Sequence, residues 1–507
     1  MCEVGSNDYV ELRKEEKSDR LGRTCMKCRE GSAVLIIRVG DAFCKSCFKD
    51  YFVHKFRAIL GKNRVVYPGE KVLLAYSGGP SSSAMIHQVQ EGLGRDAPKK
   101  LRFIPSILFI DEGAVCGQSW EQREQNVSEI CRVLQKTNFP FHIVPLEQVF
   151  TLPRSVLQSA LPGNSEHALN YKQAVNSFLE QQRAHQQDEL SVTAYELAQL
   201  CVTDTLANGS KYSCPPAELT TALMEIFNSA RTLTAKLELL QCLRRHLILH
   251  VVRMFGYSKV MSGESCTRLA VRLLANISLG RGAFLPLDTG FSDDRYGDVV
   301  IVRPMREYSL KEISFYNRLF HVESVFIPTM ETKAPENSSI QHLSEAFITK
   351  LQADFPSTVS TMYRTSEKLN ISRAESAEEN IQQEKCLLCM CNLDTHVGEA
   401  SAFCATQVSQ NLSQRLKNNV EATRDPVEQC CNSGQCSERS SSCSTSVPRT
   451  QDLIPLLCYS CRVTVKDMTS VSTFPPYILN EAGHRSRRLE IRREIQEFLL
   501  DDGCGDM

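Results

Sequence analysis

The sequence lacks a long hydrophobic run, a secretory leader and an excess of charge of either sign. No stretch approaches the roughly 20 apolar residues of a membrane-spanning helix, so we expect no membrane span. The first residues, MCEVGSNDYVELRKEEKSDR, are too polar for a signal peptide, which favours a cytoplasmic location. The formal net charge of −1 gives no overall signal for nucleic acid, although basic residues could still gather on one face.

Length and cysteine content indicate the kind of chain. The 507 residues leave room for two or three domains, and a hydrophobic content of 42% is ordinary for a globular protein. The 22 cysteines should be reduced thiols in the cytosol. Paired CxxC spacings therefore point to metal binding rather than to disulfides.

Two CxxC pairs near the N-terminus predict a zinc site. Cys25 and Cys28 form the first pair, and Cys44 and Cys47 form the second, with a strand-like stretch between them at 33–39. Each CxxC turn directs two thiolates to one point, so two turns on a short hairpin would complete a tetrahedral Cys₄ site. A redox pair, or chance, explains the second CxxC poorly. We expect residues 1–60 to form this zinc module and a helix, at 50–60, that leads into the next domain.

A second set of CxxC turns lies in the C-terminal third. Cys386 and Cys389 form one pair, with Cys391 two residues further on, and Cys458 and Cys461 form the other. Residues 402–450 between them have the polar composition of a disordered loop. Because the entropy of closing a loop rises slowly with length, the two pairs could share one zinc, and the alternative is two unrelated turns. We expect residues 371–480 to form this module.

A strand, a glycine turn and a helix follow one another at residues 72–93. The apolar run 72–76 is typical of a buried parallel strand, the turn at 77–83 reads SGGPSSS, and an amphipathic helix follows it. The first N–H groups of such a helix are unpaired and lie at the positive end of the helix dipole, so the turn could bind a phosphate. The alternative is an ordinary turn that binds nothing.

Strands and helices alternate along residues 61–370, which we assign to one α/β domain. The sequence predicts further strands at 103–110, 141–144, 259–263 and 299–302, and further helices at 120–136, 233–255, 266–279 and 310–320. This alternation predicts a doubly wound parallel sheet, in which ligands lie beyond the carboxyl ends of the strands. The alternation stops over about 146–230, which we interpret as a helical insertion with helices at 168–187 and 192–206.

Over about residues 72–369 the chain resembles the PP-loop ATP pyrophosphatases, and among them the tRNA-thiolating branch. The resemblance rests on the order of five motifs, which are SGGPSS at 77–82, FIDEG at 109–113, KVMSGESCTRLAVRLLANISLGRG at 259–282, RPMREYSLKEISFYNRLF at 303–320 and FPSTVSTMYRTSEKL at 355–369. With cysteine pairs at both ends, the chain is most similar to the second, noncatalytic type of subunit in cytoplasmic tRNA 2-thiolation complexes. The resemblance implies a sheet of the PP-loop, or adenine nucleotide alpha hydrolase-like, type.

The resemblance also assigns a role to each position of the site. Active members bind ATP in the loop and adenylate a uridine, and sulfur then displaces the activated oxygen. On that pattern the nucleotide phosphate would be held by Ser77, Gly78, Gly79 and Ser82. The family's aspartate in SGGxDS is Ser81 here, and the family's TGHNxDD turn has Glu264, Thr267 and Arg268 at its histidine and its two aspartates. Magnesium and phosphate chemistry needs carboxylate oxygens, so the resemblance implies a degenerate catalytic site and leaves ATP binding open.

The cysteines that carry sulfur or a cluster in thiolating members have no counterparts. Leu237 and Leu240 occupy the positions of a cysteine pair, and no cysteine lies between Gly280 and Arg306 to replace a later one. Cys242, alone on an apolar helix, is interpreted as a small core residue. Cys266 stays a candidate nucleophile because it lies at a helix start, where a thiolate is favoured, at the mouth of the expected cleft.

The last segment, 481–507, contains the basic amphipathic stretch HRSRRLEIRREIQEFLL at 484–500. Its apolar set is Leu489, Ile491, Ile495, Phe498 and Leu499. The stretch predicts a helix that contacts tRNA phosphates, and the candidate contacts are Arg487, Arg488, Arg492, Arg244 and Arg245. The alternative is that this helix packs on the chain's own core and its arginines are solvated.

Three functions fit the sequence. The resemblance favours a noncatalytic, tRNA-binding subunit of a complex that 2-thiolates the wobble uridine of the lysine, glutamine and glutamate tRNAs. It implies a catalytic PP-loop partner and a thiocarboxylated ubiquitin-like sulfur carrier. The alternatives are an independent ATP-dependent tRNA-modifying enzyme that uses Ser81, Glu264 or Cys266 in unusual roles, and a zinc-bearing RNA-binding scaffold.

Overall fold

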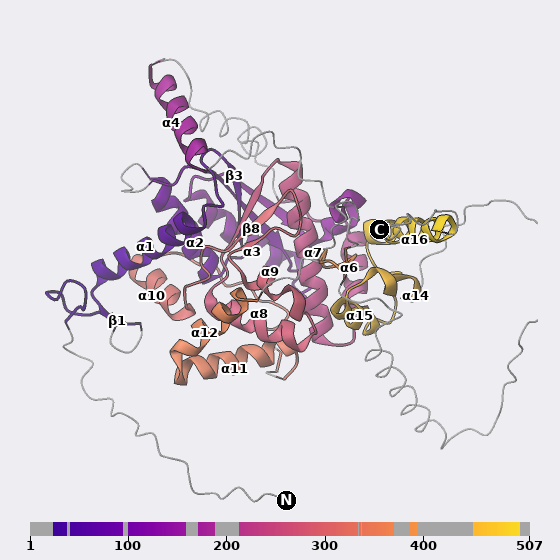
Figure 1. The fold of residues 1–507 in the computed structure, drawn as a ribbon. Helices are drawn as coiled ribbons and strands as arrows, with labels where there is room; N and C mark the ends of the chain where they lie inside the picture. The colour runs from indigo at the N-terminus through magenta and orange to yellow at the C-terminus, as the bar shows by residue number, and fades with distance from the viewer. Residues whose placement is uncertain are drawn as a thin grey trace, which may run out of the picture.

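A computed structural model describes residues 24–37, 41–94, 100–158, 171–187, 212–332, 334–335, 337–369, 385–393 and 450–496. Figure 1 shows a sheet in the middle of this part of the chain, with the N-terminal hairpin at one end and helices α15 and α16 at the other. No helix within these ranges is both long enough and apolar enough to cross a membrane.

The sheet has six strands in the order β5-β4-β3-β6-β8-β7. The strands are Lys71–Tyr76 (β3), Ile104–Asp111 (β4), Phe141–Pro145 (β5), Lys259–Ser262 (β6), Ser292–Asp293 (β7) and Val300–Val302 (β8). All neighbours are parallel except β7 and β8, so the predicted doubly wound parallel sheet is confirmed. The short edge strand β7 was not predicted, because two residues give no periodic signal.

Hydrophobic cores on both faces explain why the strands are apolar throughout. On β3, Val72, Leu74 and Tyr76 belong to one core, and Leu73 belongs to the other. The first core is completed by helices Lys45–Asn63 (α1), Pro80–Leu93 (α2), Trp120–Gln135 (α3) and Leu310–Phe320 (α10). The second is completed by Ala217–Ser229 (α6), Leu233–Met254 (α7), Tyr459–Lys466 (α15) and Pro476–Gln496 (α16). Each large apolar side chain buried in this way contributes about 1.5–3 kcal/mol.

A third, smaller core holds three helices together beside the sheet. The helices are Cys266–Ser278 (α8), Ile340–Asp354 (α11) and Pro356–Glu367 (α12). Ala270 of α8, Ile348 of α11 and Tyr363 of α12 are its buried centre. Figure 1 shows α11 and α12 on the outer side of α8.

The remaining elements are short, apart from one helix. They are strands Leu35–Ile36 (β1) and Ala42–Phe43 (β2), which pair in an antiparallel hairpin, helices Tyr171–Gln187 (α4), Leu285–Thr289 (α9) and Thr450–Leu453 (α14), and 3₁₀ turns Leu146–Thr151 (η1), Arg154–Leu157 (η2), Gly282–Phe284 (η3) and Ile454–Leu456 (η4). The described part of the expected insertion therefore contains α4 and α6 but begins with two 3₁₀ turns that pack on the second core. The helix expected at 192–206 lies outside the described residues, and so does the loop expected at 402–450 except for its last residue.

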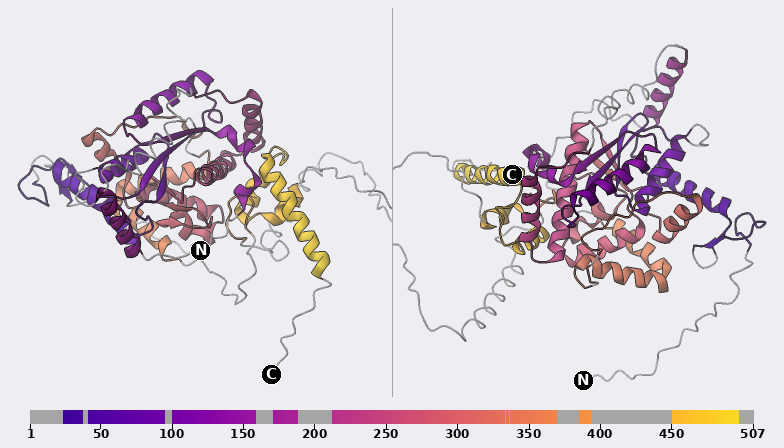
Figure 2. Two further views of the ribbon diagram at one scale, coloured as in Figure 1. Left: turned by 90° about the horizontal axis from the view of Figure 1, so that it is seen from above. Right: turned by 180° about the vertical axis from the view of Figure 1, so that it is seen from behind.

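The last helix differs from its prediction. It begins at Pro476 rather than at His484, and its first turns bury Tyr477, Ile478 and Ala482 in the second core. Proline is common at the first helical position, because its fixed φ suits a helix and its missing N–H needs no partner there. Further along, Ile491 and Ile495 are 54% and 47% exposed, and Figure 2 shows this end of α16 projecting from the body of the molecule.

Two loops meet where the order of the strands reverses. β4 pairs with one edge of β3 and β6 pairs with the other, so the turns that follow β3 and β6 flank the switch point of the sheet. Gly263, directly after β6, lies against the backbone of Ser82. A Cβ atom on Gly263 would be 2.8 Å from Ser82 Cα and 3.0 Å from Ser82 N. Only glycine allows this approach.

The contact predicts the effect of a single methyl group. Gly263→Ala should lower the free energy of unfolding by about 1–3 kcal/mol, because the backbone of Ser82 cannot move aside as a side chain could. Gly282→Ala is the matched control, since a Cβ at Gly282 meets no atom within 4 Å. Denaturant unfolding measures both variants, and equal stability of the two would contradict the proposed close approach.

Candidate functional site

The turn after β3 is hydrogen-bonded to itself. Gly78 has a φ of 79°, a left-handed conformation that favours glycine, and Gly79 is the N-cap of α2. Ser82 Oγ donates to the Gly79 carbonyl at 3.0 Å and accepts from Ser77 N at 3.3 Å. The two serine hydroxyls lie 3.3 Å apart. Both serines that the sequence assigned to a phosphate thus have partners within the turn.

A segment that follows α10 packs on the same turn. Val325 N donates to the Gly78 carbonyl at 2.8 Å, and Asn317 Nδ2 of α10 donates to the Pro80 carbonyl at 2.9 Å. A Cβ atom on Gly78 would lie 3.0 Å from Val325 O. Several backbone groups of the turn therefore serve to hold the fold together.

Ser81, at the position of the family's first aspartate, lies in the first turn of α2 and is partly buried. It offers a neutral hydroxyl, which supplies no charge for a magnesium ion.

Glu264, at the histidine position, is held between two arginines. Arg303 Nε donates to its carboxylate at 2.8 Å, and Arg272 makes a second ion pair with it. Burial alone would raise the pKa of Glu264, but the charges of Arg272 and Arg303 outweigh it and lower the pKa. Arg303 is itself buried and donates to the carbonyls of Leu287 and Gly290, both at 3.0 Å. Glu264 is thus an ionised carboxylate whose charge is already paired with Arg272 and Arg303.

The other two altered positions hold α11. Thr267 Oγ1 donates to Gln352 Oε1 of α11 at 3.1 Å. Arg268 Nη1 lies 3.3 Å from Glu345 Oε1 of the same helix, in an ion pair whose arginine side chain is 54% exposed. An exposed pair contributes at most about 1 kcal/mol, so the buried hydroxyl contact is the more specific of the two.

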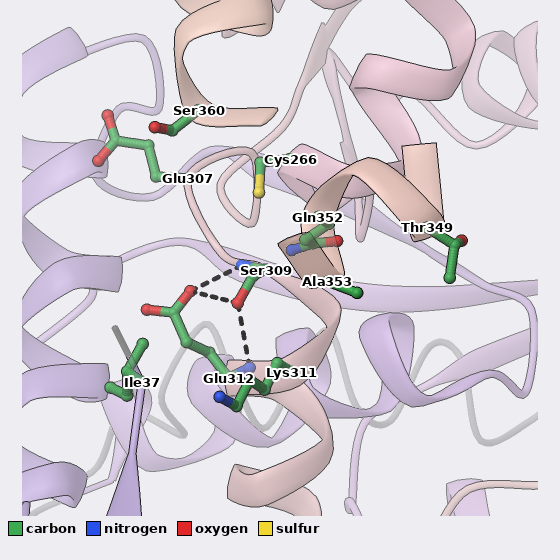
Figure 3. Close-up of a pocket in the computed structure, with 10 residues that line it drawn as sticks. All are labelled: Ile37, Cys266, Glu307, Ser309, Lys311, Glu312, Thr349, Gln352, Ala353 and Ser360. Atoms are coloured by element: carbon green, nitrogen blue, oxygen red, sulfur yellow. Dashed lines mark hydrogen bonds between the residues drawn. The ribbon is translucent and has the colours of Figure 1, made fainter. Parts of the chain in front are cut away.

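Cys266 lines a cavity that the sequence did not reveal. The cavity has a volume of about 260 Å³ and lies between α8, α10, α11 and the N-terminal hairpin. Figure 3 shows the sulfur turned toward Gln352 and Ser309. Ser309 and Glu312 are already joined by a capping box, and Cys266 N donates to the Tyr308 carbonyl at 2.8 Å.

The acidic pair after β4 is bound to arginines. Asp111 accepts from Arg123 Nε at 2.7 Å, and Glu112 accepts from Arg244 Nη2 at 2.7 Å. Arg244 is 42% exposed in its side chain, and Arg245 beside it is partly buried. Arg244, which was a candidate for tRNA contact, therefore already has an acidic partner.

The arginines of α16 have different surroundings. Arg487, Arg488 and Arg492 are exposed. Arg485, earlier on the same helix, is partly buried and donates to Glu481 at 2.8 Å and to the Leu157 carbonyl at 3.1 Å. The exposed basic surface of this helix is thus confined to its projecting end.

The four N-terminal cysteines come together on the β1–β2 hairpin. The sulfur atoms of Cys25, Cys28, Cys44 and Cys47 all lie within 4.8 Å of one another. Backbone hydrogen bonds form the first turn, since Cys25 N donates to the Gly31 carbonyl at 2.7 Å and Gly31 N donates to Cys28 Sγ at 3.4 Å. Burial raises the pKa of Cys25, but backbone N–H groups of Cys28, Cys44 and Lys27 lower it to about 6, whereas burial and the neighbouring thiols raise the pKa of Cys47 to about 12. Metal ligation requires all four as thiolates, so metal binding would release protons from this cluster.

The four C-terminal cysteines also come together, in the interior. The sulfur atoms of Cys386, Cys389, Cys458 and Cys461 lie within 4.8 Å of one another, and all four residues are buried. They belong to the second core with α7, so this module packs as part of the α/β domain. Four convergent thiols are the donor set of a tetrahedral metal site.

Comparison with known proteins identifies the family. A family model described as cytoplasmic tRNA 2-thiolation protein 2 matches residues 339–463. Cytoplasmic tRNA 2-thiolation protein 2-A of Xenopus laevis is 59% identical, with 100% of both chains covered. Cytoplasmic tRNA 2-thiolation protein 2 of Homo sapiens is 50% identical over 99% of this chain and 98% of its own.

The chain belongs to the cytoplasmic tRNA 2-thiolation protein 2 family.

Membership of this family confirms the resemblance that the motifs indicated. The matched region begins at the N-cap of α11 and ends within α15, so it includes the helix that Thr267 and Arg268 contact and the C-terminal cysteines. Among solved structures, the U34-tRNA thiolase NcsA from Methanococcus maripaludis with its [4Fe-4S] cluster is 14% identical, with a TM-score of 0.42 and coverage of 68% of this chain and 86% of that chain.

Sequence reasoning missed several neighbours of the C-terminal cysteines. Cys242 of α7, predicted to be a core residue, is buried but lies beside Cys461. Arg295 Nη1 donates to Cys391 Sγ at 2.8 Å. These contacts join residues that are far apart in the sequence, and no spacing rule connects them.

Proposed function

We propose that this chain is a noncatalytic subunit of a complex that 2-thiolates the wobble uridine of cytoplasmic tRNA, in the formation of mcm5s2U. Its work is to bind the lysine, glutamine and glutamate tRNAs and to support a catalytic PP-loop partner, which adenylates the uridine and receives sulfur from a thiocarboxylated ubiquitin-like carrier. The names of the relatives support the tRNA substrate, the thiolation and the cytoplasmic location.

One observation carries the noncatalytic role. At the three positions where the resemblance requires carboxylates, the chain has Ser81, Thr267 and Arg268, and the last two are engaged with α11. Phosphoryl and adenylyl chemistry depends on magnesium held by such carboxylates. Glu264 does not replace them, since it is already the counter-ion of Arg272 and Arg303. ATP binding by the turn at Ser77–Ser83 is therefore not part of the proposal.

Zinc is the metal that we assign to the two cysteine clusters. Tetrahedral sites with four thiolates and no open position are typical of structural zinc. The N-terminal cluster would fix the hairpin and display Lys27, Arg29 and Lys45, which are exposed around it. The C-terminal cluster would fix the core between α7 and α15.

The projecting end of α16 is the proposed tRNA contact. Its exposed Arg487, Arg488 and Arg492 present positive charge without an aromatic platform, which suits recognition of phosphates and shape rather than of bases. Ile491 and Ile495 are exposed on the same end, so the helix does not pack there on the described core.

Product analysis tests the noncatalytic role. The purified chain is incubated with ATP, tRNA and a sulfur donor, alone and together with its PP-loop partner. Because the carboxylates are missing, the chain alone should form neither AMP nor 2-thiouridine, whereas the heteromer should form both. AMP produced by the chain alone would favour an independent enzyme, and failure to form a stable heteromer would favour a scaffold.

Charge reversal tests the tRNA contact. A variant with Arg487→Glu, Arg488→Glu and Arg492→Glu should bind tRNA more weakly, and the slope of log K against log salt should fall by about 0.7–0.9 for each phosphate that the helix no longer neutralises. The control reverses three exposed charges elsewhere, on α10 and α11, with Lys311→Glu, Arg318→Glu and Lys350→Glu. Fluorescence anisotropy at several salt concentrations measures both. Equal binding by the two variants would assign α16 a packing role.

A further inference from the structure

A buried arginine with unused hydrogen-bond donors directly follows Gly280, the residue that packs against the second CxxC turn. Arg281 follows α8 and is 7% exposed. Its Nη1 makes an ion pair with Glu238 Oε2 of α7 at 2.5 Å. Its Nε and Nη2 atoms are buried and have no hydrogen-bond partner among the described residues. Leaving a buried charged donor unsatisfied costs several kcal/mol, so these N–H groups indicate a missing acceptor.

The backbone beside Arg281 is pressed against the second CxxC turn. A Cβ atom on Gly280 would lie 2.6 Å from two ring carbons of Tyr459, the residue that directly follows Cys458. Cys461 also has Cys242 of α7 beside it. Arg281 and the sulfur atoms are therefore parts of one packed unit, although they come from the end of α8 and from the C-terminal module.

With a metal ion bound, the sulfur atoms of this cluster would be the missing hydrogen-bond acceptors. Four thiolates around a divalent ion carry a net charge of about −2, and sulfur atoms that carry charge accept N–H hydrogen bonds. At the N-terminal cluster water can supply such bonds, because Cys28 is exposed. At the C-terminal cluster all four cysteines are buried, so the protein has to supply them.

We propose that Arg281 is a positioning residue of the C-terminal metal centre, where its Nε and Nη2 groups donate to the thiolate sulfurs of the loaded cluster. The inference rests on the metal-binding role proposed above for these cysteines and does not depend on tRNA thiolation. It explains why a charged side chain with unused donors is buried in the domain.

Two further observations support this role. Arg295 shows that a buried arginine donates to a cysteine in this region, since its Nη1 donates at 2.8 Å to the Sγ of Cys391, two residues after Cys389. The guanidinium stays charged inside the domain, because arginine keeps its proton in proteins and Glu238 pairs with it on one side.

The test separates the hydrogen bonds from the ion pair. The double variant Arg281→Met with Glu238→Gln removes the donors and leaves no unpaired charge, while Glu238→Gln alone breaks the ion pair and keeps the guanidinium. Zinc release from the full-length chain to a chromophoric chelator is followed for wild type and both variants. A variant with Cys458→Ser and Cys461→Ser identifies the phase that belongs to the C-terminal centre, and the N-terminal phase is the internal control.

We expect the double variant to release the C-terminal zinc about 10–100 times faster, as for other outer-sphere partners of metal ligands, while Glu238→Gln and the N-terminal phase stay close to wild type. Equally faster zinc release from both variants would contradict the proposal, because the loss of the ion pair would then explain the whole effect. Zinc release from the double variant at the wild-type rate would also overturn it. Arg281→Lys covers the case in which the double variant does not fold. It keeps the charge but not the planar pair of donors, so its release should also be faster than that of wild type, and unchanged release would contradict the role.

Discussion

The ion pairs of one partly buried carboxylate determine what the turn after β6 can do. Glu264 lies between Arg272 and Arg303, and a carboxylate that neutralises two guanidinium groups is not available as a magnesium ligand or a base. Thr267 and Arg268 are also engaged within the protein, since both contact α11. At two of the positions that the resemblance assigns to catalytic carboxylates, side chains of this chain instead hold α11 against α8.

The two cysteine clusters stabilise the chain in different ways. Figure 1 places the hairpin of the N-terminal cluster and the α15 module of the C-terminal cluster at opposite ends of the molecule. The first has an exposed ligand, Cys28, and the second is enclosed by the core of α7. On the proposed metal-binding role, water can solvate the thiolates of the exposed cluster, whereas buried thiolates need donors from the protein, which is the role proposed for Arg281.

Local patterns predicted much of this structure, and long-range contacts did not follow from them. The periodicity of residues 310–320 gave α10 with its observed bounds, and the CxxC spacings grouped the eight metal-ligand candidates correctly. The pairing of Arg244 with Glu112 and the contact of Cys242 with Cys461 join residues more than a hundred positions apart. Such contacts are set by how the helices pack on the sheet, so charge and helix pattern alone could not reveal that Arg244 pairs with Glu112.

The most direct test of the noncatalytic account is the amount of 2-thiouridine at the wobble position of tRNA in cells that lack this chain and express either wild type or Gly79→Asp. Asp is a favourable N-cap, and a Cβ at Gly79 meets no atom closer than 3.5 Å, so the variant should fold while its negative charge repels a phosphate. The account predicts loss of 2-thiouridine without the chain and full restoration by both forms. Restoration by wild type but not by a folded Gly79→Asp chain would contradict it, because the turn would then have to bind a nucleotide.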